Sequence, residues 1–401
     1  MDGGGKLRFY DFFAGAGLAT LGLRRSWQCI WANDISPRKA AIYRANFGDG
    51  HFHLGDVTGV SADSLPRPAS MAWASFPCQD LSLAGWRKGL AGERSGVFWA
   101  FWRILRELAA RGERPGLVAL ENVPGLLYGD GFNGLAEALA ALDMQFGALV
   151  MDARWFLPQS RPRVFVVAAD RRLDAVPFAG EGPSAEWSPP PLLAAHDRLP
   201  AGVRDLWRWW RVPAPRGPVP PLAGMIAADA SGIGWHTKGE TARLLELMSP
   251  ANRAKIEAAR AAGSRQIGFL YRRMRRAGQR AEVRFDGLAG CLRTPRGGSS
   301  RQTVVVVEEG RVRTRLLSAR EAARLMGAPD GFALPERYNE AYQAMGDGVA
   351  VPVVAWLSER LLKPLAEALP AAAGRPLAET APHAALAEQR AAEWLAARGQ
   401  L

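Results

Sequence analysis

Short apolar runs alternate with helical patterns over the first 170 residues of this 401-residue chain. The runs at 71–76 and 117–120 have the length of buried strands, whereas between Val97 and Arg111 apolar residues recur at helical spacing. Strands that alternate with helices are typical of a doubly wound α/β sheet. Because ligands bind such sheets at the carboxyl ends of the strands, we expect the functional residues directly after the apolar runs.

A glycine loop containing Gly15 and Gly17 follows the first run, 7–10. Glycines at this place allow a tight turn and a close approach of the backbone to a ligand. Asp34 ends the second run, where a carboxylate can accept both hydroxyls of a ribose, and Asp56 ends a third segment. Taken singly, each acid is more often a surface charge or a helix cap than a ligand of a cofactor. The series favours a cofactor that contains adenosine.

Three reactive or charged side chains stand at later run ends: Cys78 and Glu121 follow apolar runs, and Arg163 precedes one. A cysteine thiolate is the most nucleophilic side chain near neutral pH, and a carboxyl group can donate a proton. A free cysteine is usually buried and inert, which is our interpretation of Cys29 and Cys291. The Pro-Cys-Gln context favours a nucleophile at Cys78. Glu121 and Arg163 could also form a mutual salt bridge, which is compatible with catalysis.

The elements Pro77-Cys78-Gln79, Glu121-Asn122-Val123 and Gln159-x-Arg161-x-Arg163 occur together and in this order. In this respect the chain resembles the cytosine-5 DNA methyltransferase family, and the resemblance covers about residues 7–363 without permutation. It implies an α/β fold, namely a Rossmann-like S-adenosylmethionine-dependent methyltransferase fold with an inserted smaller target-recognition domain. It also implies the activity of a DNA (cytosine-5)-methyltransferase that acts on a flipped-out cytosine through a covalent bond between Cys78 and C6.

The resemblance assigns a role to each catalytic candidate. Cys78 adds to C6, Glu121 protonates N3 and holds the exocyclic amine, and Arg163 hydrogen-bonds O2. Arg161 is expected to have a positioning role. The base that removes the C5 proton cannot be identified from the sequence.

The resemblance likewise places S-adenosyl-L-methionine at the glycine loop, with Phe13 against the adenine, Asp34 on the ribose and Asp56 near the adenine amine. The loop at Asp347 and Gly348 matches the family's last motif, although many members have Asn-Ser there, which puts these two side chains in doubt. The expected cofactor residues are Phe13, Gly15, Ala16, Gly17, Asp34, Ile35, Asp56, Val57, Pro77, Asp347 and Gly348.

The net charge of +12 is unevenly distributed, because residues 171–300 hold 21 Lys and Arg against 11 Asp and Glu. A basic region beside a nearly neutral one suggests a polyanionic partner, although an arginine-rich solvated face explains charge alone equally well. Seven arginines lie between Arg265 and Arg284. Four of them are expected to contact DNA, and the family's mobile loop and its return segment add four further contacts. The expected DNA contacts are Gln79, Ser82, Arg272, Arg273, Arg275, Arg276, Thr294 and Arg296.

Four segments are expected. Residues 1–170 form the first part of the catalytic and cofactor-binding domain, 171–300 the basic target-recognition domain, 301–364 the returning catalytic segment and 365–401 an Ala/Pro-rich tail. Ser318 and Glu321 form a predicted capping box.

Three cysteines cannot form a disulfide framework, no apolar run is long enough to span a membrane, and there is no Cys-x-x-Cys pair. We therefore expect a cytoplasmic protein without a metal site. The expected partners are double-stranded DNA and a cognate restriction endonuclease that acts on the same sequence, and the chain is expected to be a monomer. The alternatives are a tRNA cytosine-5 methyltransferase of the same fold and a DNA-binding regulator that has lost catalysis.

Overall fold

The computed structural model describes residues 6–77, 97–228, 230, 232–275, 278–293, 301–370 and 384–396. Six of the expected site residues lie outside this description: Cys78, Gln79, Ser82, Arg276, Thr294 and Arg296. The chain divides into two compact units. Unit 1 comprises residues 1–151, 162–214 and 353–401, and unit 2 comprises 152–161 and 215–352.

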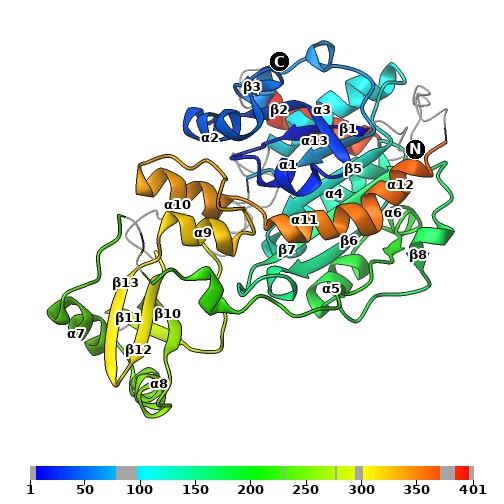
Figure 1. Ribbon diagram of the computed structural model, residues 1–401. Coiled ribbons are helices and arrows are strands. Elements are labelled where there is room, and N and C mark those ends of the chain that lie inside the picture. The colour runs from blue at the N-terminus through cyan, green and yellow to red at the C-terminus, as the bar shows by residue number, and fades with distance from the viewer. Residues whose placement is uncertain are drawn as a thin grey trace, which may run out of the picture. The chain divides into compact units, whose positions relative to one another are not determined.

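Unit 1 is built on a seven-stranded sheet with the strand order β3-β2-β1-β4-β5-β7-β6 (Figure 1). Strands β3, β2, β1, β4 and β5 run parallel, and β7 is antiparallel to β5. The predicted α/β sheet is therefore confirmed, and the sequence did not reveal that β7 runs opposite to β5. The strands are β1 (Leu7–Phe12), β2 (Trp27–Asp34), β3 (Phe52–Leu54), β4 (Met71–Ala74), β5 (Leu117–Asn122), β6 (Met144–Asp152) and β7 (Pro162–Asp170).

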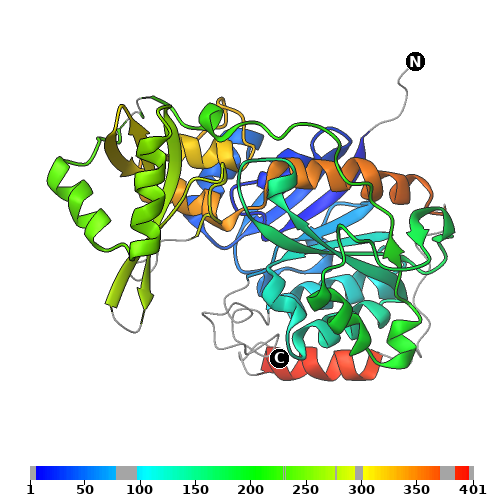
Figure 2. The ribbon, with the colours of Figure 1, turned by 90° about the horizontal axis from the view of Figure 1, so that it is seen from below.

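Helices cover both faces of this sheet. Figure 2 shows α11 and α12 along one face and α3, α4 and α13 on the other. Ser358 and Glu359, in the π-helical turn η8 (Ser358–Leu362) between α11 and α12, accept hydrogen bonds from Trp27 and Ser26 at the start of β2. The helices of unit 1 are α1 (Leu18–Leu23), α2 (Pro37–Phe47), α3 (Val97–Ala110), α4 (Gly131–Ala140), α5 (Pro190–Asp197), α6 (Ala201–Arg204), α11 (Val351–Leu357), α12 (Lys363–Glu367) and α13 (Ala384–Ala396).

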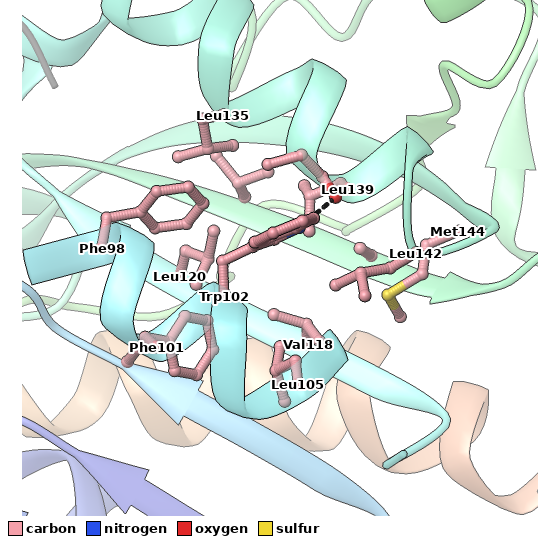
Figure 3. Packing of buried hydrophobic residues seen from close by; sticks show 14 of the residues in the cluster. Phe98, Phe101, Trp102, Leu105, Val118, Leu120, Leu135, Leu139, Leu142 and Met144 are labelled. Atoms are coloured by element: carbon pink, nitrogen blue, oxygen red, sulfur yellow. Dashed lines mark hydrogen bonds between the residues drawn. The ribbon is translucent and has the colours of Figure 1, made fainter. Parts of the chain in front are cut away.

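The main core lies between the sheet and helices α3 and α4. Trp102 of α3 packs among apolar side chains of both helices and donates its indole N–H to the carbonyl oxygen of Ala138, at 2.8 Å (Figure 3). Helix α13 closes this layer from outside, because Trp394 and Leu395 are buried in the same cluster. The Ala-rich tail therefore contributes to the core of unit 1.

Residues 171–214 also belong to unit 1, although composition groups them with the basic region that follows. The indole N–H of Trp210 donates to the carbonyl oxygen of Val167 in β7, and Trp207 packs in the main core. The short strands β8 (Ala179–Gly180) and β9 (Trp209–Trp210) pair with each other. The boundary between the compact units thus falls near residue 214, and differs from the expected boundary at residue 170.

Unit 2 contains a four-stranded antiparallel sheet with the order β11-β10-β12-β13. A small core forms beneath it from Leu270, Val283 and Val305 with Ile256 of α8. Both halves of the predicted capping box at Ser318 are present at the start of α9. The elements are η7 (Leu222–Met225), α7 (Lys238–Glu246), α8 (Pro250–Ala261), β10 (Gln266–Arg275), β11 (Gly278–Arg284), β12 (Thr303–Glu308), β13 (Arg311–Leu316), α9 (Ala319–Leu325) and α10 (Tyr338–Asp347).

Candidate active site

Glu121 and Arg163 meet at one edge of the sheet of unit 1. Glu121 is near the carboxyl end of β5, and Arg163 is near the amino end of β7. Because the two strands are antiparallel, these ends lie side by side, and Glu121 is opposite Phe165 in the register. The Nε of Arg163 is 3.0 Å from the Oε1 of Glu121, with only 13% and 9% of the two side chains exposed. The salt bridge between Glu121 and Arg163, which the sequence only suggested as an alternative, is therefore present.

Asn122 links this pair to the loop that leads to the thiol candidate. Its side-chain Nδ2 donates to the carbonyl oxygen of Phe76 at 3.1 Å, and its Oδ1 accepts from the backbone N–H of Val123. Strands β4 and β5 are parallel neighbours, so Phe76 and Pro77 leave the sheet at the edge where Glu121 lies. Cys78, outside the described residues, follows Pro77 directly in the sequence.

The first two residues of the Gln-x-Arg-x-Arg element have a different setting. The Arg161 guanidinium is 1% exposed and donates to the carbonyl oxygens of Leu292 at 2.9 Å, Gly346 at 2.7 Å and Gly348 at 2.5 Å, all within unit 2. Gln159 is equally buried and donates to the carbonyl oxygen of Leu325. These contacts fix two loops of unit 2 to the segment 152–161, which supports the positioning role expected for Arg161. They also show how Gly348 is held, which the sequence could not indicate.

The glycine loop after β1 has the backbone geometry that the sequence predicts. Gly15 and Gly17 have φ angles of +59° and +83°, in the left-handed region that favours glycine. A Cβ atom at Gly17 would lie 2.3 Å from the ring of Phe47 and 2.9 Å from that of Tyr43, so no larger residue fits there without displacing α2. Phe13 adopts φ +57°, and Ala16 is buried in the loop.

Asp34 connects the glycine loop to α2. Its Oδ2 accepts from the backbone N–H of Gly15 at 2.9 Å, and its Oδ1 accepts from that of Ser36 at 2.8 Å. Each oxygen retains a second lone pair, so the carboxylate can still accept from a ligand hydroxyl. Ile35 beside it is 65% exposed and offers an apolar surface next to the carboxylate. Asp56 caps the turn that begins at Val57 through the backbone N–H of Thr58.

Asp11 is a further candidate for the site, and no sequence motif described above indicates it. It lies in β1 directly before the glycine loop and is fully buried. Its Oδ2 accepts from the hydroxyl of Thr20 at 2.6 Å, whereas its Oδ1 has no hydrogen-bond partner among the residues that the structure describes. Burial raises the pKa of Asp11 to about 7 against the effect of the Thr20 hydrogen bond, and repulsion from Asp34 adds to the rise.

A buried acceptor without a partner beside a glycine loop fits a ligand that brings a positively charged donor. The methionine part of S-adenosylmethionine carries an ammonium group, its ribose carries two hydroxyls and its adenine is apolar. Asp11 and Asp34, on the neighbouring strands β1 and β2, offer a matching acceptor and carboxylate, and Ile35 directly after β2 offers an apolar surface. A polar residue within the buried segment Leu7–Phe12 was the signal that could have found Asp11.

The site candidates of unit 1 therefore gather at one edge of its sheet, at the carboxyl ends of β1, β2, β4 and β5. Within the described part of the chain no group of His, Cys, Asp and Glu side chains could hold a metal ion. None of the described helices is long and apolar enough to cross a membrane.

Sequence comparison gives a consistent result. The model of the family described as C-5 cytosine-specific DNA methylase matches residues 7–199 and 233–363. The Type II methyltransferase M.HhaI of Haemophilus parahaemolyticus is 27% identical over 358 residues, which cover 88% of this chain and 93% of that protein. The Type II methyltransferase M.MspI of Moraxella sp is 25% identical over 365 residues, which cover 88% and 70%.

Solved structures resemble the fold over a similar span. The Entamoeba histolytica methyltransferase EhMeth has a TM-score of 0.62 at 15% identity, and the S. pombe Dnmt2 methyltransferase has 0.58 at 16%. Each comparison covers 90% of this chain and 99% of the other. At these identities the likeness concerns the fold, and it confirms the predicted Rossmann-like methyltransferase architecture.

Proposed function

The chain belongs to the C-5 cytosine-specific DNA methylase family, and from that premise we propose that it methylates C5 of a flipped-out cytosine in a specific duplex DNA sequence. The proposed methyl donor is S-adenosylmethionine. The observation that carries this proposal is the buried Glu121–Arg163 pair, which Asn122 ties to the loop ahead of Cys78.

The proposed chemistry begins with Cys78. Addition of its thiolate to C6 forms a carbon–sulfur bond and moves ring electrons toward N3 and O2. Glu121 donates a proton at N3, and Arg163 donates a hydrogen bond to O2. S-adenosylmethionine, when bound, supplies an electrophilic methyl group, which C5 takes. A base then removes the C5 proton, the C5–C6 double bond forms again as the carbon–sulfur bond breaks to free the Cys78 thiolate, and N3 returns its proton to the Glu121 carboxylate.

The salt bridge supports these roles because it orients both side chains before substrate arrives. A guanidinium that already holds the carboxyl group at 3.0 Å leaves fewer arrangements to be fixed during the reaction. The target base must leave the duplex to reach this edge, at a cost of roughly a few kcal/mol. Gln79 and Ser82, in the segment after Cys78, are proposed to contact the flipped DNA.

The proposed cofactor site uses the glycine loop and the two strand-end carboxylates. Asp11 would accept from the ammonium group through Oδ1, and Asp34 would accept from the ribose hydroxyls. Phe13, Ile35 and Val57 would pack on the adenine, and Asp56 would accept from its amino group. The remaining proposed contacts are backbone contacts at Gly15, Ala16, Gly17, Pro77, Asp347 and Gly348.

We propose that DNA is contacted by the ribbon of β10 and β11. Strand β12 pairs with β10 only at residues 266–270, whereas β11 pairs with β10 up to Arg275. Beyond Leu270 no further strand of the described residues pairs with β10, and β11 has only an isolated bridge, from Ala281 to Met248. The end of this pair is therefore a two-stranded ribbon, and such a ribbon fits the major groove of DNA. Its exposed side chains are Arg272, Arg273, Met274, Arg275 and Arg280.

The arginines of this ribbon fall into two groups. Glu282 forms ion pairs with Arg273, at 3.4 Å, and with Arg275, and the Arg273 guanidinium lies 4.9 Å from the ring centre of Tyr271. Arg272 and Arg280 have no ion pair within the described part of the chain. We propose that the oriented pair reads base edges and that the other two arginines contact phosphates. Thr294, Arg296 and Arg276 are proposed as further DNA contacts.

The Type II names of the relatives support a role in restriction and modification. We propose a cognate endonuclease that cuts the sequence this enzyme protects. The remaining proposals are a monomeric enzyme in the cytoplasm and target recognition by the part of the expected segment 171–300 that lies in unit 2, from residue 215 onward.

The test is methyl transfer from labelled S-adenosylmethionine to duplex DNA of mixed sequence, followed by mapping of modified cytosines by bisulfite sequencing. Wild type should label cytosine within one short sequence. Cys78→Ala should abolish transfer, and Cys291→Ala is the matched control that should retain it. Transfer to tRNA but not to duplex DNA, or binding of DNA without any transfer, would refute the proposal in favour of an RNA enzyme or a regulator.

A second experiment separates the two groups of arginines. Arg272→Ala with Arg280→Ala should weaken binding to all DNA sequences and reduce the salt dependence of the binding constant by about two phosphate contacts. Glu282→Gln should instead reduce the ratio of cognate to random DNA affinity, because Arg273 and Arg275 lose the ion pairs that orient them. Equal effects on cognate and random DNA in both variants would contradict the division.

A further inference from the structure

A chain of hydroxyl groups runs behind the glycine loop of unit 1. The Thr20 hydroxyl on α1 lies 2.6 Å from the Oδ2 of Asp11, and the Tyr43 hydroxyl on α2 lies 3.2 Å from the Thr20 oxygen. The Nε2 of His51 lies 3.0 Å from the Tyr43 hydroxyl. The hydroxyl groups of Thr20 and Tyr43 thus connect the buried carboxyl group of Asp11 to the half-buried imidazole of His51.

The donors in this chain can all point toward Asp11. An ionised Asp11 can only accept hydrogen bonds, so the Thr20 hydroxyl must be the donor to it. The Thr20 oxygen is then free to accept a hydrogen bond from the Tyr43 hydroxyl. Tyr43 can in turn accept from a protonated Nε2 of His51. The other neighbour of the Tyr43 hydroxyl is the Cys29 sulfur at 3.4 Å, which is a weak acceptor. Hydrogen bonds aligned in one direction strengthen each other, so the alignment favours negative charge on Asp11.

Tyr43 also fixes the loop by packing. Its side chain is fully buried, and its ring lies 4.9 Å from that of Phe47 and 4.7 Å from that of Phe52, measured between ring centres. The same ring occupies the space that a Cβ atom at Gly17 would enter. One residue of α2 therefore bounds the glycine loop with its ring and holds Thr20 with its hydroxyl.

We propose that Tyr43 and Thr20 are positioning residues of the cofactor site, which hold Asp11 by Oδ2 so that its Oδ1 remains for the ammonium group of S-adenosylmethionine. The inference rests on the proposed function and extends it to residues that do not touch the cofactor. Neither Tyr43 nor Thr20 belongs to a motif that the sequence analysis identified.

The charged and titratable groups around Asp11 set the expected response to pH. Asp34 on β2 repels the carboxylate. Burial raises the pKa of Cys29 and of Tyr43, and the Asp11 charge adds to both rises. The pKa of His51 is lowered, chiefly by burial and also by the charge of His53. Because the pKa of Asp11 is about 7, cofactor affinity should increase as pH rises through neutrality. Loss of a donor raises this pKa further and moves the midpoint upward.

The test measures the Kd for S-adenosylmethionine by calorimetry between pH 6 and 9, using the full chain. Tyr43→Phe should raise the Kd about fivefold to tenfold at pH 7.5 and shift the midpoint of the pH profile upward, with kcat unchanged at saturating cofactor. Thr20→Val should do the same more strongly, and Thr20→Ser should restore affinity because it retains the hydroxyl.

Tyr10→Phe is the matched control. Tyr10 is also fully buried, and its hydroxyl donates at 2.7 Å to the carbonyl oxygen of Pro66, away from this chain of hydroxyls. It should lower stability without moving the Kd or its pH profile. A Tyr43→Phe enzyme with wild-type Kd and profile, or an equal loss in Tyr10→Phe, would overturn the inference. Failure of wild type itself to bind the cofactor would instead refute the proposed function.

Discussion

Each unit of the molecule buries an acidic side chain, and the two acids have different surroundings. In unit 2, Glu321 is 1% exposed and receives the Arg315 guanidinium on both oxygens, at 2.6 and 2.8 Å. The backbone N–H groups of Ser318 and Ala227 also donate to it at 2.9 Å. In unit 1, Asp11 is as deeply buried, and among the described residues it receives hydrogen bonds from Thr20 alone, with the hydroxyl at 2.6 Å.

The difference supports the proposal that the charge on Glu321 is structural and the charge on Asp11 is functional. Glu321 joins the segment after η7, strand β13 and helix α9 of unit 2, and all its acceptor capacity serves that purpose. Asp11 costs folding free energy because a buried charge has been left without a counter-charge. Such a cost is tolerated where a ligand later supplies the missing partner.

The two acids should also respond to pH in opposite directions. Burial alone would raise the pKa of Glu321, but the hydrogen bonds from Arg315 and Ser318 prevail and lower it. Its contribution to stability is therefore present above its ordinary pKa of 4.5 and is lost as pH falls through the lower folded value. The pKa of Asp11 is raised from 3.8 to about 7, so its contribution is most favourable below 3.8 and is lost as pH rises through about 7.

The largest expected effect comes from removing the partner of the paired acid. Arg315→Met should lower the free energy of unfolding by about 3–5 kcal/mol at pH 7.5, because it leaves the Glu321 carboxylate buried and alone. Urea denaturation measures the loss. The double variant Arg315→Met with Glu321→Leu should recover most of it, and a single variant within 1 kcal/mol of wild type would be inconsistent with a buried pair.

Removal of the unpaired charge should have the opposite sign. Asp11→Asn should raise the free energy of unfolding of the cofactor-free protein by about 2–4 kcal/mol at pH 8, since the folded state no longer contains an isolated carboxylate. The gain should vanish near pH 4, where Asp11 is protonated in the folded state. Denaturation at pH 4, 6 and 8 tests this, and a gain independent of pH would show that charge is not the cause.

Removal of the hydroxyl that donates to Asp11 should cost less. Thr20→Val should lower the free energy of unfolding by about 1–2 kcal/mol at pH 8, because the carboxylate then lacks its hydrogen bond. The cost should decrease at pH 5. Thr20→Ser should stay near wild type, and an equal cost in both variants would point to lost packing rather than to the hydroxyl.

The smallest expected effect on stability comes from an ion pair at the surface. Arg106 of α3 and Glu388 of α13 are 2.7 Å apart, with 24% and 48% of their side chains exposed. Glu388→Gln should change the free energy of unfolding by about 0.5 kcal/mol or less, because water screens the pair. Thermal denaturation at low and high salt is sufficient, and a cost above 1 kcal/mol would mean that α13 depends on this contact.

The sequence predicted those features that depend on neighbours along the chain. The glycine loop, the strand ends at Asp34 and Glu121 and the capping box at Ser318 are local patterns of residue type. The family motifs also identified Arg163 as the partner of a strand-end acid. In each case the physical cause lies within a few residues: a φ angle, a strand end or a helix cap.

The features that the sequence did not predict depend on contacts between distant segments. The antiparallel direction of β7, which brings Arg163 to Glu121, cannot be predicted from the composition of β5 or β7. Asp11 looks like an ordinary polar residue at a strand end until Thr20 and Tyr43 are seen around it. Residues 171–214 look irregular because their order comes from tryptophans that pack against β7 and the main core, not from periodicity.

The division of unit 1 into three chain segments has a consequence for biosynthesis. Residues 152–161 and 215–352 make up all of unit 2, whereas unit 1 also needs 353–401. A nascent chain that has reached residue 352 can complete unit 2, while the sheet of unit 1 still lacks α12 and α13. At roughly 5–20 residues per second, synthesis of the roughly 180 residues from 214 to 395 takes on the order of ten to forty seconds. During that interval the apolar surface destined for Trp394 and Leu395 is open to chaperones.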